Sequence, residues 1–298
     1  MTYPSWLWVV FTLIAATAQT FRNAAQRSLI DQLGTVGATH IRFLFGLPFG
    51  LLSLAAGALV WGELPRPNTE SLLWTVFGAL SQITATALML AAMRERSFVV
   101  TTAYTHTEPV QIALFAAIFL SEPVSLSLAV AVVVACAGVL LLSWPSRAGT
   151  EIYSWRPACL GVASGTFFAL TAVGFRGGIT ALEADHFSSA AILTLAIALT
   201  VQTACLSVWL LWREPMVLQA ILNAWRPSLA AGFLGAFAST NWFLAFALTN
   251  PARVRTLGVV EIVIAGLVSR RLFAQTPGIR DVLGMVLVSI GIVLLFNG

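Results

Sequence analysis

One short stretch of the chain, from Tyr104 to Gln111, carries several side chains that could bind a polar solute within apolar surroundings. At about 100° per residue, Tyr104, Glu108 and Gln111 would share one face of a helix, and His106 would point elsewhere. Pro109 lacks a backbone donor, so we expect it to kink or open the helix beside Glu108. Such a stripe could offer acceptors to an ammonium group and hydroxyls to a carboxylate, as a small zwitterion requires. Alternatively, Glu108 lies near a helix end and pairs only with an arginine.

Other polar or aromatic side chains in apolar stretches could join this site. Glu261 lies between Val259-Val260 and Ile262-Val263, so its carboxyl would be either protonated or paired with Arg253, Arg255 or Arg176. It is interpreted as a coupling acid or as half of a structural pair between helices. The candidate substrate-binding residues are Gln19, Gln82, Tyr104, His106, Glu108, Gln111 and Trp242, and the candidates for gating or coupling are Glu261 and Pro109.

No spacing typical of a catalytic or metal site accompanies these residues. His106 and Glu108 are two positions apart, whereas a helical zinc pair needs three or four. Cys136, Cys159 and Cys205 lie far apart and form no CxxC motif. The chain also has no glycine-rich phosphate loop and no nucleophile elbow. We therefore expect no metal, no cofactor and no enzymatic activity, with an intramembrane enzyme using His106 and Glu108 as acid and base kept as a remote alternative.

The composition indicates that these residues belong to a membrane protein. Of the 298 residues, 58% are hydrophobic and 9% are charged, whereas a soluble domain carries about 25% charged residues. All 16 basic residues are arginines, and the net charge is +4. They are scattered near the ends of apolar runs instead of forming one cluster, which favours contact with a lipid bilayer and disfavours a nucleic-acid partner.

Apolar runs punctuated by charges, prolines and glycines predict ten membrane-spanning helices of about 20 residues each. Backbone groups in lipid must hydrogen-bond internally, and the runs are too long and too uniformly apolar for barrel strands. The expected fold is thus an all-α membrane protein, with the first run kept as a helix because no basic segment precedes it. The runs cover residues 4–21, 36–60, 71–93, 98–120, 124–144, 157–176, 187–211, 227–248, 252–273 and 278–297.

The two halves of the chain are weakly similar to each other. A shift of 153 residues aligns Glu108 with Glu261 and Gly138 with Gly291. Each half then holds five helices, and an odd number means that the second half enters the membrane from the opposite side. This is the inverted repeat of many secondary transporters, which encloses a central cavity. The expected repeats cover residues 1–148 and 149–298.

The segment FLSEPVSL at residues 119–126, with the apolar run that ends in GVLLL at 138–142, resembles the closing signature of an EamA-type repeat of the drug/metabolite transporter superfamily. Residues 283–295 resemble a second copy. The chain departs from strict symmetry at Gln275, which stands where the first repeat has Glu122. Within the superfamily, the chain looks most similar to bacterial amino acid exporters, including the aromatic amino acid (YddG-type) group.

The resemblance implies an inner-membrane secondary transporter that exports amino acids, aromatic and other neutral ones first, by alternating access. Its partners would be a small-molecule substrate and the lipid bilayer, and a monomer would be sufficient. An alternative is an exporter of lipophilic cations, drugs or other metabolites, with Glu108 or Glu261 as the counter-charge. Family members usually have both termini in the cytoplasm, whereas counting twelve of the 16 arginines on one side predicts both termini outside.

Overall fold

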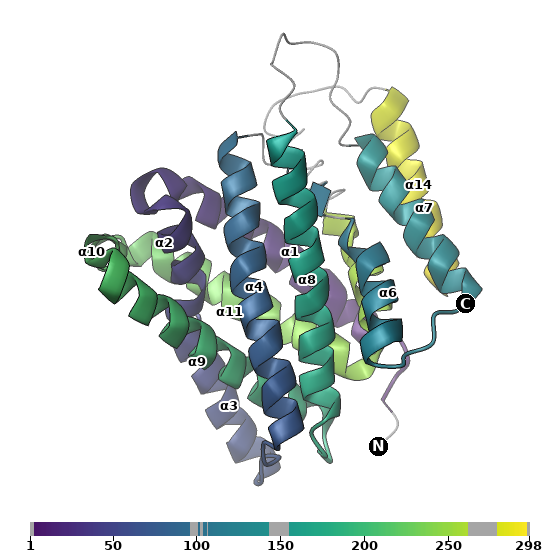
Figure 1. Ribbon diagram of the computed structural model, residues 1–298. Helices are drawn as coiled ribbons and strands as arrows, with labels where there is room; N and C mark the ends of the chain where they lie inside the picture. Colours follow the sequence, from purple (N-terminus) through teal and green to yellow (C-terminus); the bar gives the residue numbers. More distant parts are fainter. Residues whose placement is uncertain are drawn as a thin grey trace.

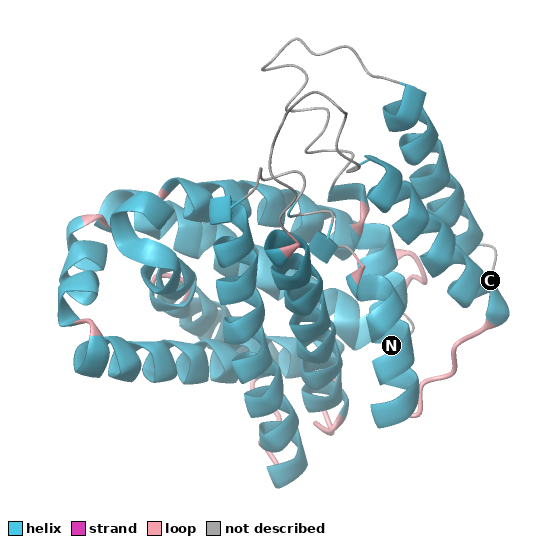
Figure 2. Cartoon of the chain, turned by 45° about the horizontal axis from the view of Figure 1, so that its top comes forward, coloured by secondary structure: helices cyan, strands magenta, loops and turns pink. Residues whose placement is uncertain are grey.

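The computed structural model describes residues 3–95, 101, 104–105, 107–142, 155–261 and 279–296, and all regular structure in these residues is helical (Figures 1 and 2). In the first half of the chain the helices are α1 (Leu7–Ser28), α2 (Ile30–Leu44), α3 (Leu47–Trp61), α4 (Thr69–Glu95), α6 (Glu108–Phe119) and α7 (Leu126–Leu142). In the second half they are α8 (Arg156–Thr180), α9 (Phe187–Arg213), α10 (Pro215–Asn223), α11 (Trp225–Leu248), α12 (Pro251–Gly258) and α14 (Ile279–Phe296).

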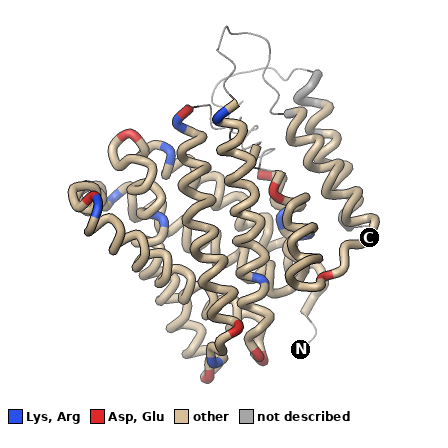
Figure 3. Tube along the Cα trace, in the orientation of Figure 1, with Lys and Arg blue, Asp and Glu red and all other residues tan. Residues whose placement is uncertain are grey.

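Five helical segments in the described part of the chain are long and apolar enough to cross a membrane. Their outer surfaces are apolar, with Leu59 89% and Leu73 68% exposed. Most charged residues lie near the ends of the helices, and a few lie within the bundle (Figure 3). The architecture agrees with the predicted all-helical membrane protein. The five segments are Ile30–Trp61, Thr69–Glu95, Arg156–Thr180, Phe187–Arg213 and Trp225–Leu248.

Several predicted helix boundaries were wrong, and two buried arginines explain the largest error. α1 continues beyond the predicted end at residue 21, and α2 begins before the predicted start at residue 36. Arg22 and Arg42 are only 1% and 2% exposed, so neither marks a helix end at the membrane surface. These two residues should not have been counted as loop arginines when the orientation was predicted. The short helix α10 was not predicted at all.

Helices from the two halves of the chain pack against each other. The most extensive contacts join α4 with α8, α7 with α14, and α1 with α11, and Figure 1 shows the first two pairs side by side. Glycines permit the close approach of α4 and α8, since a Cβ at Gly174 would lie 2.8 Å from the Cα of Gly78. Through these pairs, α1, α4, α8, α11 and α12 surround a polar centre.

Candidate functional site

The polar centre contains a small pocket built from regularly spaced side chains. On α8 these are Phe168, Thr171, Ala172 and Phe175, and on α11 they are Ser239, Trp242, Phe243 and Phe246. Both sets follow the i, i+3, i+4, i+7 spacing that puts residues on one face of a helix. Gln19 of α1, Arg42 of α2, Gln82 of α4 and Arg255 of α12 complete the lining.

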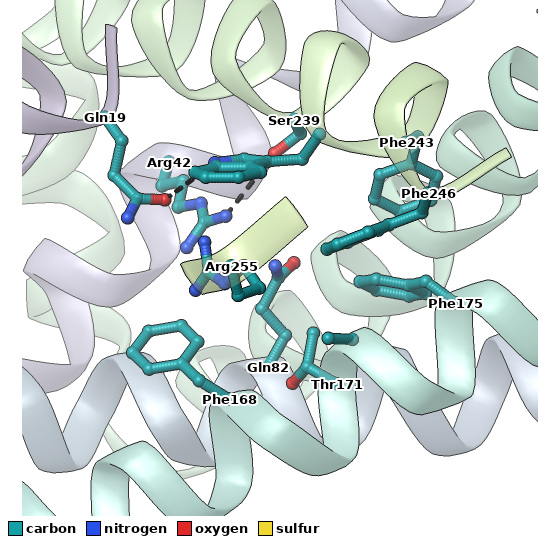
Figure 4. A pocket seen from close by; sticks show the side chains of 12 residues that line it. Gln19, Arg42, Gln82, Phe168, Thr171, Phe175, Ser239, Phe243, Phe246 and Arg255 are labelled. Carbon is teal, nitrogen blue, oxygen red and sulfur yellow. Dashed lines mark hydrogen bonds between the residues drawn. The ribbon is translucent and has the colours of Figure 1, made fainter. Parts of the chain in front are cut away.

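One side of this pocket is aromatic. The rings of Phe175 and Phe243 have centroids 4.4 Å apart, and the rings of Trp242 and Phe246 are stacked with centroids 6.1 Å apart. Figure 4 shows Phe175, Phe243 and Phe246 gathered at one end, whereas Gln19, Arg42 and Arg255 lie toward the other. A ligand with an apolar body and a polar head would therefore meet matching surfaces at both ends.

Arg42 is the buried cation of the polar end. Its Nη1 donates to Thr86 Oγ1 at 3.1 Å, and its Nη2 donates to Ser239 Oγ at 3.4 Å. Both partners are neutral hydroxyls, and no ion pair joins Arg42 to a carboxylate of the described residues. A guanidinium has five N–H donors, so Arg42 retains the capacity to bind an anionic group in the pocket.

Arg255 is held by a carboxylate instead. Its Nε and Nη2 donate to Glu108 Oε1 and Oε2 at 2.7 and 2.8 Å, and its guanidinium carbon lies 4.4 Å from the ring centre of Trp242. The start of α12 fixes this arrangement, because the Asn250 side chain caps the helix by accepting from the backbone N–H of Ala252. Glu108 lies in the first turn of α6, where the helix dipole favours a negative charge.

Gln19 connects the aromatic pocket to the second buried acid. Its Oε1 accepts from Trp242 Nε1 at 3.0 Å, and its Nε2 donates to Glu261 Oε2 at 2.9 Å. Asn23 Nδ2 donates to the other oxygen of Glu261 at 3.3 Å, and Arg22 Nη2 donates to Asn23 Oδ1 at 2.6 Å. The amide of Gln19 is therefore oriented from both sides.

A second small pocket adjoins the first, and Gln19, Phe168 and Arg255 line both. The remaining residues of the second pocket are Arg22, Asn23, Met89, Thr105, Glu108 and Glu261. Across the two pockets, three arginines face two glutamates. The polar centre thus carries one positive charge in excess when all five groups are ionised.

The structure brings five of the residues singled out in the sequence to these pockets. Gln19, Gln82 and Trp242 line the first, and Gln19, Glu108 and Glu261 line the second. Both interpretations of Glu108 therefore apply, because it lines a pocket and also pairs with an arginine. Glu261 contacts Gln19 and Asn23, whereas two of the arginines suggested for it pair elsewhere, Arg255 with Glu108 and Arg176 with Glu122.

The remaining described candidates from the sequence do not line either pocket. Tyr104 packs against Gly161, and Gln111 Nε2 donates to Thr107 Oγ1 at 3.4 Å, so neither is among the residues that line the two pockets. Pro109 lies in the first turn of α6, where its missing N–H leaves no helical hydrogen bond unmade. It was expected in mid-helix. His106 lies outside the described residues.

Sequence reasoning missed Arg22, Arg42 and most of the phenylalanines as site residues, and it considered Arg255 only as a partner of Glu261. Arg22 and Arg42 were interpreted as residues of the membrane surface, although each stands within or beside an apolar run. The spacing of the aromatic residues was the available signal, because Phe168 and Phe175 are seven positions apart and Trp242, Phe243 and Phe246 follow the same helical face.

The first half of the chain is similar to a known protein family. Residues 6–144 match the EamA-like transporter family. This match supports the predicted placement in the drug/metabolite transporter superfamily. The matched family is one of transporters, and the described helices of this chain are those of a multi-pass membrane protein.

Solved structures agree on the fold. A crystal structure that is 18% identical in sequence aligns over 96% of this chain and 95% of its own chain with a TM-score of 0.67, and it is one of 29 matching chains. At this identity, the likeness concerns the fold alone. No curated protein matches the chain significantly.

Proposed function

We propose that this EamA-like protein is an inner-membrane secondary transporter that exports amino acids, aromatic and other neutral ones first. The observation that carries the proposal is Arg42, a buried guanidinium that lines an aromatic pocket and, among the described residues, donates to two hydroxyls. A substrate carboxylate would supply its missing counter-charge by a bidentate, charge-assisted contact. The substrate side chain would pack on Phe175 and Phe243, whose rings provide an apolar surface with defined stacking geometry.

The amide side chains would fix the polar head of the substrate. Gln82 Oε1 accepts from Gln202 Nε2 at 2.8 Å, which orients Gln82 toward the pocket that it lines. Gln19 is oriented by Trp242 and Glu261 in the same way. Preorganised donors and acceptors of this kind determine orientation and specificity in small-molecule sites.

Transport by alternating access requires two halves that can rock against each other, and we propose ten spans arranged as two inverted five-helix repeats. The helix contacts support this arrangement. The first helix of each proposed half packs against the third helix of the other, as α1 does with α11 and α8 with α4, and the last helices, α7 and α14, pack together. A two-fold relation between the halves produces such reciprocal pairs, and the pockets lie between them.

The alternative of a cation exporter has less support. A lipophilic cation would need an acid that is available to it, whereas both oxygens of Glu108 are occupied by Arg255. The excess positive charge of the two pockets would also repel a cation.

Counterflow in proteoliposomes tests the proposal. Vesicles that contain the purified protein are loaded with unlabelled phenylalanine, and the uptake of labelled phenylalanine is measured in the presence of other amino acids or of tetraphenylphosphonium. We expect uptake that phenylalanine, tryptophan and leucine inhibit and that the cation leaves unchanged. The Arg42→Gln variant should lose this uptake, and the Arg213→Gln variant, whose arginine is exposed on α9, should retain it. Absence of amino acid counterflow in the unmodified protein would refute the proposal.

A further inference from the structure

The two buried acids of the site are already engaged. Glu108 accepts from Arg255 with both oxygens, and Glu261 accepts from Gln19 and Asn23 with one oxygen each. The two glutamates are 3% and 1% exposed. The charge of Glu108 is already compensated by Arg255, and the oxygens of both acids already accept hydrogen bonds, so a substrate ammonium group would gain less here than from an unengaged carboxylate.

The cationic side of the site is different. Arg42 is 2% exposed, and its described partners are the hydroxyls of Thr86 and Ser239. Figure 4 shows its guanidinium beside that of Arg255 at the polar end of the pocket. Glu108 pairs with Arg255 and not with Arg42, so two guanidinium groups line this pocket and a second carboxylate would be favoured there.

From this asymmetry we infer that the site recognises the carboxylate and the aromatic body of its substrate and not the ammonium group. It therefore takes aromatic monocarboxylates without an amino group, such as 3-phenylpropionate, in addition to aromatic amino acids. The inference rests on the proposed function, since it concerns the same pocket. It makes a separate claim, namely that the pocket binds the carboxylate and the aromatic body of the substrate and makes no specific contact with the ammonium group.

Competition between three matched ligands tests this claim. 3-Phenylpropionate lacks the amino group of phenylalanine, and phenethylamine lacks its carboxylate. In the phenylalanine counterflow assay, we expect the half-inhibitory concentration of 3-phenylpropionate to lie within about threefold of that of phenylalanine, and phenethylamine to be at least about tenfold weaker, because a charge-assisted contact is lost. Vesicles loaded with 3-phenylpropionate should also drive the uptake of labelled phenylalanine. The reverse order of the two analogues would overturn the inference.

Thermal unfolding of the detergent-purified protein separates this inference from the proposed function. We expect 3-phenylpropionate to raise the melting temperature of the unmodified protein and of Arg213→Gln, but not of Arg42→Gln. If Arg42→Gln does not fold, Arg42→Lys, which keeps the charge and loses the bidentate geometry, should show a weakened shift. Stabilisation by 3-phenylpropionate without phenylalanine counterflow would refute the amino acid assignment alone. Phenylalanine counterflow that 3-phenylpropionate does not inhibit would refute only the inference made here.

Discussion

The indole Nε1 of Trp242 donates to Gln19 Oε1 at 3.0 Å, and this contact joins the aromatic pocket on α11 to the polar face of α1. Because the Gln19 amide also donates to Glu261, the position of the Trp242 ring is linked to a buried acid on the other side of α1. The ring in turn lies over Arg255. A substrate that packs on Trp242 would therefore change the surroundings of both Glu261 and Arg255.

Replacing Trp242 with phenylalanine tests this link. Phe keeps an aromatic surface for the substrate but removes the donor to Gln19, so we predict a rise in KM for phenylalanine of about fivefold, which corresponds to the net value of one hydrogen bond, about 1 kcal/mol. Transport kinetics in proteoliposomes measure the effect. Trp225→Phe is the control, because Trp225 is 50% exposed and lies outside both pockets. An equal effect of the two substitutions would contradict the assigned role.

The pair of Glu108 and Arg255 should behave as a unit. Glu108 is 3% and Arg255 11% exposed, so we expect either Glu108→Gln or Arg255→Gln alone to lower the free energy of unfolding by about 3 kcal/mol, since each leaves a largely desolvated charge without its partner. The double variant should recover much of this loss. Thermal unfolding in detergent measures the coupling, and additive losses in the double variant would show that the two side chains do not stabilise each other.

A second ion pair, outside both pockets, should affect stability and not substrate recognition. Arg176 Nε donates to Glu122 Oε1 at 2.8 Å, both side chains are 17% exposed, and Arg176 also donates to the backbone carbonyl of Phe246. We predict that Glu122→Gln lowers the free energy of unfolding by about 1 kcal/mol and leaves KM unchanged. Glu183→Gln, at an exposed position, is the control. A change in KM with unchanged stability would assign Glu122 to the transport cycle instead.

The contact between α4 and α8 should tolerate no large side chain. Gly174→Leu would force the helices apart, so we predict a loss of about 1–3 kcal/mol, visible as a lower melting temperature and weaker counterflow. Val208→Leu is the control, because Val208 is 65% exposed on the apolar outer surface. Similar melting temperatures for the two variants would mean that α4 and α8 are less closely packed than described.

The fold could be predicted from the sequence because membrane helices have a simple signal. Apolar runs gave α4, α8, α9 and α11 to within a few residues, since these helices begin and end near charges or prolines. The prediction failed where a charge lies within the bundle. A guanidinium beside an apolar run has the same sequence signal whether it anchors the run at the membrane surface or, like Arg22 and Arg42, packs inside.

The site could be predicted only in part, for a related reason. Gln19, Gln82 and Trp242 were found because polar or indole groups in apolar runs need partners. The direction in which a side chain points depends on the rotation of its helix, which packing decides. Tyr104 and Gln111 therefore carried the same signal as Glu108, yet neither lines the described pockets.

Arg255 lines both pockets and carries a single positive charge that Glu108 already neutralises. A carboxylate in either pocket would therefore depend on the other arginine that lines it, Arg42 in the first pocket and Arg22 in the second. Under the proposed function, two carboxylates in these adjoining pockets would repel each other, so we expect the site to hold one substrate molecule at a time.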